Sequence, residues 1–355
     1  MISLLDMSFY KGKKVFITGH TGFKGSWLCK ILLNAGAVVT GYSLAPQTTP
    51  NLYDLCHFPE QLHSIIGDIR ELDNLMVHFL NAKPEIVFHL AAQPLVRDSY
   101  DNPVYTYETN VMGTVNLLEC VRQTSSVKSV VNVTTDKVYF NHEWDWGYRE
   151  NELLNGFDPY SNSKSCSELV TSSYINSFFS ERKLSVSTAR AGNVIGGGDF
   201  ASNRIIPDCV RAASKGEPIV VRNPNSTRPY QHVLDPLYAY LMIAKEQFLD
   251  TSIAGCYNVG PEDSDCVTTG RLVDLFIDYW RDDATWINVN DGGPHEANFL
   301  KLDCSKLKNR FHWKPTWDVE RAIQKTVEWS KIYMTNGDVS KCMDLQIDEF
   351  FNRNH

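Results

Sequence analysis

The chain of 355 residues is 43% hydrophobic and 12% aromatic, with a formal net charge of −8. This composition excludes a disordered chain, a collagen-like chain and a coiled-coil rod, and the acidic balance disfavours nucleic acid as a partner. Nine irregularly spaced cysteines and no zinc-type His or Cys motif lead us to expect reduced thiols, a cytoplasmic location and no metal. No apolar run approaches the ~18–20 residues of a membrane span, so we expect no membrane partner.

Short apolar strands alternate with amphipathic helices through the first half of the chain. This alternation predicts an α/β fold, in which helices cover both faces of a doubly wound parallel sheet of the Rossmann type. We expect strands at residues 15–18, 38–42, 65–67, 86–90, 130–133 and 186–189, and helices at residues 28–35, 72–80, 104–118 and 160–179.

The second half of the chain is less regular. Apolar spacing predicts helices at residues 272–279 and 319–330, the second with Asp318 as its N-cap. We therefore expect a sheet domain at residues 1–193, with later returns near 230–260. A smaller mixed α/β substrate domain would then occupy residues 194–355.

A glycine-rich turn at residues 19–25 follows the first predicted strand and opens the first predicted helix. Glycines three residues apart let the backbone approach a pyrophosphate at a helix N-terminus. Three glycines in seven residues can also be an ordinary turn, but the strand–turn–helix context favours a dinucleotide. The candidate residues are Gly19, Thr21, Gly22, Phe23, Lys24 and Gly25.

At two positions the sequence leaves the identity of the dinucleotide and its contacts undecided. Tyr42, Ser43 and Leu44 stand where an acidic residue usually binds the ribose, so this position does not separate NAD from NADP. Asp68 follows the third strand, where it could bind the adenine amine or act as a helix N-cap.

Tyr160 and Lys164 lie four residues apart on one face of a predicted helix. An ammonium near a phenol lowers the phenol's pKa, and the phenolate could accept a proton from an alcohol that loses hydride. The alternative is an ordinary pair of solvated side chains. Thr135, Asp136 and Lys137 follow the fifth strand, at the sheet edge where ligands bind in such folds, or they form a polar loop start.

Taken together, these three motifs resemble the extended short-chain dehydrogenase/reductase family, and its sugar-nucleotide 4,6-dehydratase branch in particular. Further similar stretches are residues 88–93, 108–114, 190–199, 223–229 and 314–315. Branch members for thymidine- and guanosine-diphosphate sugars carry Thr-Asp-Glu after the fifth strand, whereas this chain has Lys137 as the third residue. The resemblance implies CDP-glucose as the substrate and tightly bound NAD that is regenerated in each turnover.

The resemblance also implies roles for the catalytic residues. Tyr160 would accept the proton of the sugar 4-hydroxyl, Lys164 would lower the pKa of Tyr160 and hold the nicotinamide ribose, and Thr135 would bind the reacting oxygen. Asp136 would protonate the departing 6-hydroxyl. Lys137 would remove the C5 proton or, alternatively, stay charged and stabilise the enolate. Further cofactor contacts are expected from Asp68, Ile69, Leu90, Ala91, Ala92, Gln93 and Thr109.

The expected substrate contacts are Arg97, Asn193, Arg204 and Arg228. The guanidinium groups match diphosphate oxygens, although a lone Arg can also be a solvated surface charge. Asn193 would bind the sugar nucleotide or serve as a turn residue.

Two other functions remain open. A 4-epimerase would share Thr135, Tyr160 and Lys164 but would need no acid and base at 136 and 137. A non-enzymatic dinucleotide-binding protein would not need the Tyr-Lys pair. By the same resemblance we expect a homodimer or a dimer of dimers, paired through helices near 103–122 and 160–180.

Overall fold

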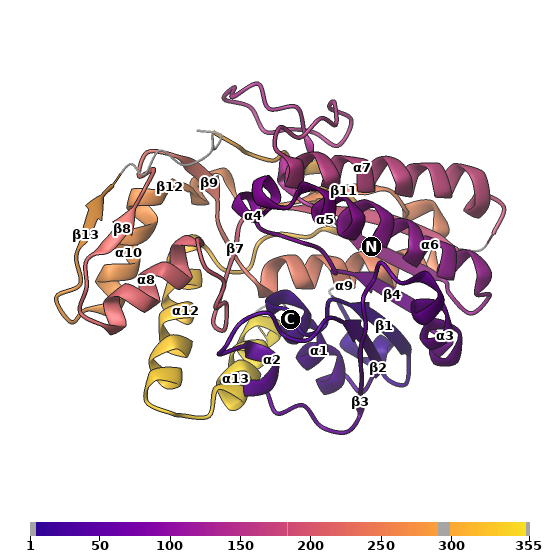
Figure 1. Ribbon diagram of the computed structural model, residues 1–355, viewed down its shortest axis with the longest axis horizontal. Coiled ribbons are helices and arrows are strands. Elements are labelled where there is room, and N and C mark those ends of the chain that lie inside the picture. Colours follow the sequence, from indigo (N-terminus) through magenta and orange to yellow (C-terminus); the bar gives the residue numbers. More distant parts are fainter. Residues whose placement is uncertain (1–4, 183, 290–298, 353–355) are drawn as a thin grey trace.

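The computed structural model describes residues 5–182, 184–289 and 299–352 (Figure 1). Its centre is a seven-stranded sheet in the order β11-β6-β5-β4-β1-β2-β3, and every neighbouring pair of these strands is parallel. The predicted doubly wound parallel sheet is therefore confirmed. The strands are β1 (Lys14–Thr18), β2 (Val38–Ser43), β3 (Leu62–Ile66), β4 (Ile86–His89), β5 (Ser129–Val133), β6 (Ser185–Ala191) and β11 (Cys256–Val259).

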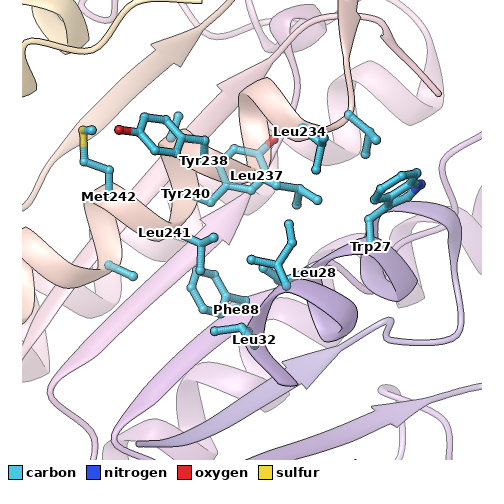
Figure 2. Close-up of a cluster of buried hydrophobic side chains, with 14 of the residues drawn as sticks. Trp27, Leu28, Leu32, Phe88, Leu234, Leu237, Tyr238, Tyr240, Leu241 and Met242 are labelled. Carbon is cyan, nitrogen blue, oxygen red and sulfur yellow. The ribbon is translucent and has the colours of Figure 1, made fainter. Parts of the chain in front are cut away.

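Helices cover both faces of the sheet because successive strand residues point to opposite sides and are apolar on both. On one face, α1 (Phe23–Asn34) and α9 (Leu234–Leu249) pack on β4 through Leu28, Leu237 and Phe88 (Figure 2). On the other face, α3 (Leu72–Ala82), α6 (Gly113–Gln123) and α7 (Pro159–Tyr174) cover Phe16 and Val87. Burial of both faces holds the strand ends in a fixed arrangement.

The predicted helix at residues 104–118 is interrupted. It consists of α5 (Pro103–Tyr107), a π-helical turn at Glu108–Met112, and α6. A second π-helical turn, Ile175–Phe179, continues α7. Apolar periodicity finds the helical run but not the extra residue in its turn, because a π-turn shifts the helical face only locally.

A second lobe lies beside the sheet, on the left of Figure 1. Its core contains Ile219, Leu272, Phe276 and Ile323. Asp318 accepts a hydrogen bond from the Arg321 backbone N–H at 2.7 Å, which confirms the predicted N-cap. The lobe contains α8 (Ile205–Ser214), α10 (Thr269–Trp280), α12 (Val319–Met334), β7 (Val194–Ile195), β8 (Ile219–Val221), β9 (Thr227–Pro229), β10 (Gln231–His232), β12 (Cys266–Thr268) and β13 (Trp286–Asn288).

The chain returns from this lobe to the sheet more than once. Residues 234–259 supply α9 and the edge strand β11, neither of which was predicted as an individual element. The last described helix, α13 (Val339–Asn352), contacts α1 through Lys30 and Asp344, whose charged atoms are 2.9 Å apart. The domain boundaries at residue 193 therefore stay a prediction. No helix among the described residues is long and apolar enough to cross a membrane.

Candidate active site

The order of the strands reverses between β1 and β4. The chain leaves β1 for β2 on one side and later reaches β4 on the other. In sheets of this kind, ligands bind in the crevice outside the carboxyl ends of the strands at this point. At this edge the Thr18 hydroxyl oxygen accepts hydrogen bonds from the backbone N–H groups of Leu90 and Ala91, each at 3.2 Å. The first strand thereby fixes the segment at residues 90–93, whose Ala92 is half-buried.

The three glycines of the glycine-rich turn (residues 19–25) have different structural roles. Gly19 has a φ of +77°, and a Cβ there would lie 2.7 Å from the Ala91 nitrogen. A Cβ on Gly25 would lie 2.1 Å from the Gly19 carbonyl oxygen, so Gly25 allows the helix to pack against the turn. A Cβ on Gly22 would meet only the Gly19 oxygen at 3.4 Å. Gly22 is therefore the position at which the backbone is open to a ligand.

Helix α1 begins at Phe23 without a side-chain cap, because its N-cap is Gly22. Its first N–H groups have no acceptor within the helix and can bind an anion such as a pyrophosphate. Thr21 is oriented by hydrogen bonds to the Ser43 hydroxyl at 2.9 Å and the Leu44 carbonyl at 2.8 Å. The cradle therefore fits the phosphate groups of a dinucleotide.

Asp68 does not cap the helix that follows it. The N-cap of α3 is Glu71, so the N-cap interpretation of Asp68 is wrong. The Asp68 carboxylate instead accepts hydrogen bonds from the Arg70 backbone N–H and guanidinium, which lower its pKa. The neighbouring Ile69 is buried, and its carbonyl oxygen accepts a hydrogen bond from Asn116 at 3.0 Å.

The π-helical turn holds a polar residue that the sequence analysis did not select as a site residue. Asn110 accepts a hydrogen bond from the Gln93 N–H at 2.8 Å and donates to the Ser163 hydroxyl of α7 at 2.9 Å. The adjacent Thr109 hydroxyl is buried and has no hydrogen-bond partner among the described residues. That orphaned hydroxyl fits the ligand contact expected of Thr109, which stays a prediction. That Asn110 falls in the π-helical turn can be seen only in the three-dimensional structure.

Thr135 and Asp136 lie directly after β5. The Thr135 hydroxyl donates to Asp136 Oδ1 at 3.0 Å, whereas Asp136 Oδ2 is buried and lacks a partner within the described part of the chain. Burial raises the pKa of Asp136, although nearby Lys137 opposes this shift. The raised pKa makes the protonated form of this carboxyl more accessible than that of an exposed Asp, which suits a proton donor.

Helix α7 brings Tyr160 and Lys164 to the same strand end. The Lys164 ammonium donates to the Val133 carbonyl oxygen at 3.2 Å. Burial lowers the pKa of Lys164 to about 8, and the Glu168 carboxylate opposes that shift. Burial raises the pKa of Tyr160 to about 12, although the hydrogen bond with Thr135 lowers it. The expected lowering of the Tyr160 pKa toward neutrality is therefore wrong for the protein alone, because burial dominates.

Lys24 is a second lysine with a lowered pKa at this site. Burial, together with the charges of Arg204 and Lys164, lowers the pKa of Lys24 to about 7. Its ammonium lies 6.0 Å from the centre of the Tyr240 ring. The sequence analysis placed Lys24 in the glycine-rich turn but found no signal for this proximity, because Tyr240 comes from α9.

The four expected substrate residues are placed differently. Arg204 is the N-cap residue of α8, pairs with Asp199 at 2.9 Å and acts electrostatically on Tyr160. Arg228 is buried on β9 and acts on Asp136. These two residues therefore reach the same centre as the catalytic candidates. Asn193 and Arg97 are half-buried, in the loop between β6 and β7 and on α4 (Val96–Asp101) respectively.

No group of His, Cys, Asp or Glu side chains within residues 5–182, 184–289 and 299–352 is arranged to hold a metal ion. The arrangement is instead a crevice with a phosphate cradle on one side and a hydroxyl, a protonatable carboxyl, a phenol and lysines on the other. The parallel sheet and this set of residues define a Rossmann-type enzyme of the extended short-chain dehydrogenase/reductase class.

The chain belongs to the GDP-mannose 4,6 dehydratase family, whose family model matches residues 16–326. It is 46% identical to the CDP-glucose 4,6-dehydratase of Salmonella typhimurium, over 98% of this chain and 99% of that protein. The resemblance to the 4,6-dehydratase branch is thus confirmed at the level of the family.

Solved structures agree with the fold. The UDP-glucose 4-epimerase of Thermus thermophilus in complex with NAD is 25% identical, with a TM-score of 0.78, over 89% of this chain and 98% of that chain. An epimerase of Methanothermobacter thermautotrophicus has a TM-score of 0.81 at 20% identity, over 93% of this chain and 95% of that chain.

Proposed function

We propose that the protein is an NAD-dependent CDP-glucose 4,6-dehydratase, a hydro-lyase that forms CDP-4-keto-6-deoxy-D-glucose. The observation that carries the proposal is the buried Asp136, whose pKa is raised and whose Oδ2 has no partner within the described chain. Elimination of water requires a proton donor for the departing hydroxyl, whereas epimerisation requires none. The 46% identity to a CDP-glucose 4,6-dehydratase supports cytosine as the base of the nucleotide.

The cofactor site fits NAD. The uncapped N-terminus of α1 and the open side of Gly22 suit the pyrophosphate, and the orphaned Thr109 hydroxyl offers a further polar contact. NAD when bound would supply the hydride acceptor for C4 of the sugar and the hydride donor for C6. Related proteins include an epimerase that holds NAD on the same fold.

Tyr160 and Thr135 act on the sugar 4-hydroxyl. As the phenolate, Tyr160 accepts its proton when hydride leaves C4, and Thr135 hydrogen-bonds the same oxygen. The phenolate forms only when bound ligands offset the burial that raises the Tyr160 pKa in the protein alone. Lys164, on the same face of α7 as Tyr160, carries a positive charge and donates a hydrogen bond to the Val133 carbonyl oxygen at the end of β5. The result of this step is a 4-ketone, which acidifies the C5 proton.

Lys137 and Asp136 act on the two neighbouring carbons. Lys137, as the neutral amine, takes the C5 proton, and Asp136 gives its proton to the 6-hydroxyl, which leaves as water. After hydride return to C6, the proton on Lys137 returns to C5. The proton taken by Tyr160 replaces, through solvent, the one that Asp136 gave, so the net change is the loss of one water.

Lys137 is tested by isotope exchange. A Lys137→Met variant should lose exchange of the C5 proton with deuterated solvent. Exchange at the wild-type rate would instead favour the alternative in which Lys137 stabilises the enolate and another group moves the proton. The lysines with lowered pKa at the site, Lys24 and Lys164, are the first candidates for that group.

The substrate diphosphate is expected to contact Arg204 and Arg228, whose charges act on Tyr160 and Asp136 respectively. Their guanidinium groups offer paired N–H donors to phosphate oxygens. Arg97 and Asn193, both half-buried, complete the proposed substrate residues.

We further propose a cytoplasmic homodimer. Exposed apolar side chains lie along α5 to α7 and the second π-helical turn, and they are Val104, Met112, Leu169 and Phe178. Packing these helices against a second copy would cover them. Light scattering of the purified protein distinguishes a monomer, a dimer and a dimer of dimers.

A nucleotide panel tests the main proposal. The purified protein and NAD are incubated with CDP-, dTDP-, GDP- and UDP-glucose and with GDP-mannose, and product masses are followed. Loss of one water from CDP-glucose alone, without net NADH, is expected. Loss of water from another member would overturn the nucleotide, an unchanged mass with a rearranged sugar would favour a 4-epimerase, and no reaction would favour a binding protein.

A further inference from the structure

Glu168 is a buried carboxylate that the proposed reaction does not use. It lies on the same face of α7 as Tyr160 and Lys164, eight and four residues further along the chain respectively. Its ion-pair partner is Arg190 of β6, at 2.9 Å, and each of the two side chains is only 2% exposed. A buried ion pair costs desolvation energy, so its presence beside the catalytic residues calls for a reason.

Four hydrogen bonds converge on the two oxygens of Glu168. Arg190 donates from Nε at 3.0 Å and from Nη2 at 2.9 Å. Thr134 donates at 2.5 Å and Thr188 at 2.7 Å. Thr134 directly precedes the catalytic candidate Thr135, so the carboxylate joins α7 to the carboxyl end of β5. A carboxylate with all four acceptor positions used is held in one orientation.

Arg190 continues the network away from α7. Its Nη1 donates to the Tyr139 hydroxyl and to the Glu150 carbonyl oxygen, both at 2.9 Å. The Tyr139 hydroxyl in turn donates to Asn258 of β11 at 2.6 Å. The Glu168 network, defined as Glu168, Arg190, Thr134, Thr188 and Tyr139, therefore ties the catalytic helix to three strands and to the segment that follows Lys137.

We infer that Glu168 is a positioning residue, which fixes the height and rotation of α7 against β5 and keeps the Lys164 side chain charged. The inference rests on the proposed function for the role of Lys164 in turnover. The geometric part follows from the four hydrogen bonds, since a rotation of α7 would break them. The electrostatic part follows from the spacing of Glu168 and Lys164, which are neighbours on one helical face.

Other charges face Lys164 from neighbouring elements. Lys24 of α1 is a like charge, and His89 of β4 is held neutral because burial lowers its pKa to about 3. Burial alone also disfavours the Lys164 ammonium, so that its pKa is about 8. The Glu168 carboxylate opposes this shift and stabilises the Lys164 charge. Loss of the carboxylate charge should therefore lower the Lys164 pKa further.

A titration of the protein without substrate tests this directly. Lysines are labelled with ¹³C at Cε, and the Lys164 signal is assigned by its loss in Lys164→Arg. Glu168→Gln keeps the size of the side chain and should lower the Lys164 pKa by about 1–2 units. Tyr139→Phe removes a distant member of the network and should leave it unchanged. No shift in Glu168→Gln, or an equal shift in both variants, would overturn the inference.

Glu168→Asp separates position from charge. Its carboxylate remains but is one methylene shorter, so Lys164 should titrate close to wild type while kcat for CDP-glucose falls about 10²-fold. A wild-type kcat in this variant would overturn the positioning role, and this variant also serves if Glu168→Gln does not fold.

For Glu168→Gln, the alkaline limb of the kcat profile should move to lower pH, whereas a uniform loss at every pH would indicate a structural role only. If the wild-type protein converts no sugar nucleotide, the proposed function fails, but the titration still decides the electrostatic part.

Discussion

The glycine-rich turn and the active face of α7 lie on two sides of one crevice and are built by opposite means. The turn is defined by what its residues lack, because Gly19 and Gly25 leave space for Ala91 and for the turn's own carbonyl oxygen. The α7 side is built from buried ionisable groups, among them Asp136, Lys164 and Glu168. The first side depends on steric fit over a few residues, and the second depends on a balance of charges across the fold.

The largest expected effect is on the charged side. Arg190→Met leaves Glu168 buried without its counter-charge and should lower the free energy of unfolding by about 3–5 kcal/mol. Urea unfolding measures this change. Arg149→Met is the matched control, since Arg149 forms an exposed pair with Glu152 and its loss should change stability by less than about 1 kcal/mol. Equal effects of the two substitutions would show that burial of the Arg190 pair is immaterial.

On the steric side, Gly25→Ala should lower the free energy of unfolding by about 3 kcal/mol, because its Cβ would lie 2.1 Å from the Gly19 oxygen. The same variant should lose NAD binding, measured by calorimetry, since the turn must open to accommodate the methyl group. Gly22→Ala is the control, with a Cβ at 3.4 Å from that oxygen and an ordinary φ of −78°. It should fold with stability within about 0.5 kcal/mol of wild type. Wild-type stability and NAD binding in Gly25→Ala would contradict the steric account.

A smaller effect concerns the pH dependence of the free energy of unfolding, and it arises at His89. Burial lowers the His89 pKa to about 3 from an ordinary value of 6.5, so the folded protein holds this ring neutral. Below pH 6.5 the unfolded chain binds a proton here that the folded protein does not, so stability falls by about 1.4 kcal/mol per pH unit. His89→Gln should remove this part of the slope between pH 6.5 and 5.

The slope is measured by urea unfolding at several pH values. His57→Asn is the control, because His57 is exposed and its φ of +47° also suits Asn. An unchanged slope in His89→Gln, or the same change in His57→Asn, would contradict the assignment to buried His89.

The smallest expected effect is at Lys24. Lys24 is the second residue of α1, where a positive charge opposes the helix dipole. Lys24→Met should therefore raise the free energy of unfolding of the protein without ligand by about 0.5–1 kcal/mol. A loss of stability would mean that the contact of Lys24 with the Tyr240 ring outweighs the dipole. Phe23→Leu, which changes no charge, is the control for altered packing at the same helix end.

Regular local patterns made much of the fold predictable. Apolar runs that alternate with helical spacing predicted six strands of the parallel sheet, and Asp318 was recognised as an N-cap from its place before an apolar period. The order of the glycine-rich turn, Thr135, Tyr160 and Lys164 along the chain was sufficient to identify the family, because each motif follows a particular strand. These features depend on residues that are close in sequence.

Tertiary structure decided the features that depend on distant residues. Strand β11 and helix α9 join the sheet from residues 234–259, and no local pattern states which edge they cover. The π-helical turn places Asn110 between Gln93 and Ser163, and Asp68 pairs with Arg70 instead of capping α3. The protonation of the site was likewise hidden, because burial raises the pKa of Tyr160 and lowers that of Lys24. A sequence determines which groups are present, but their desolvation and charge partners exist only once α1, α7 and α9 meet around the ends of the strands.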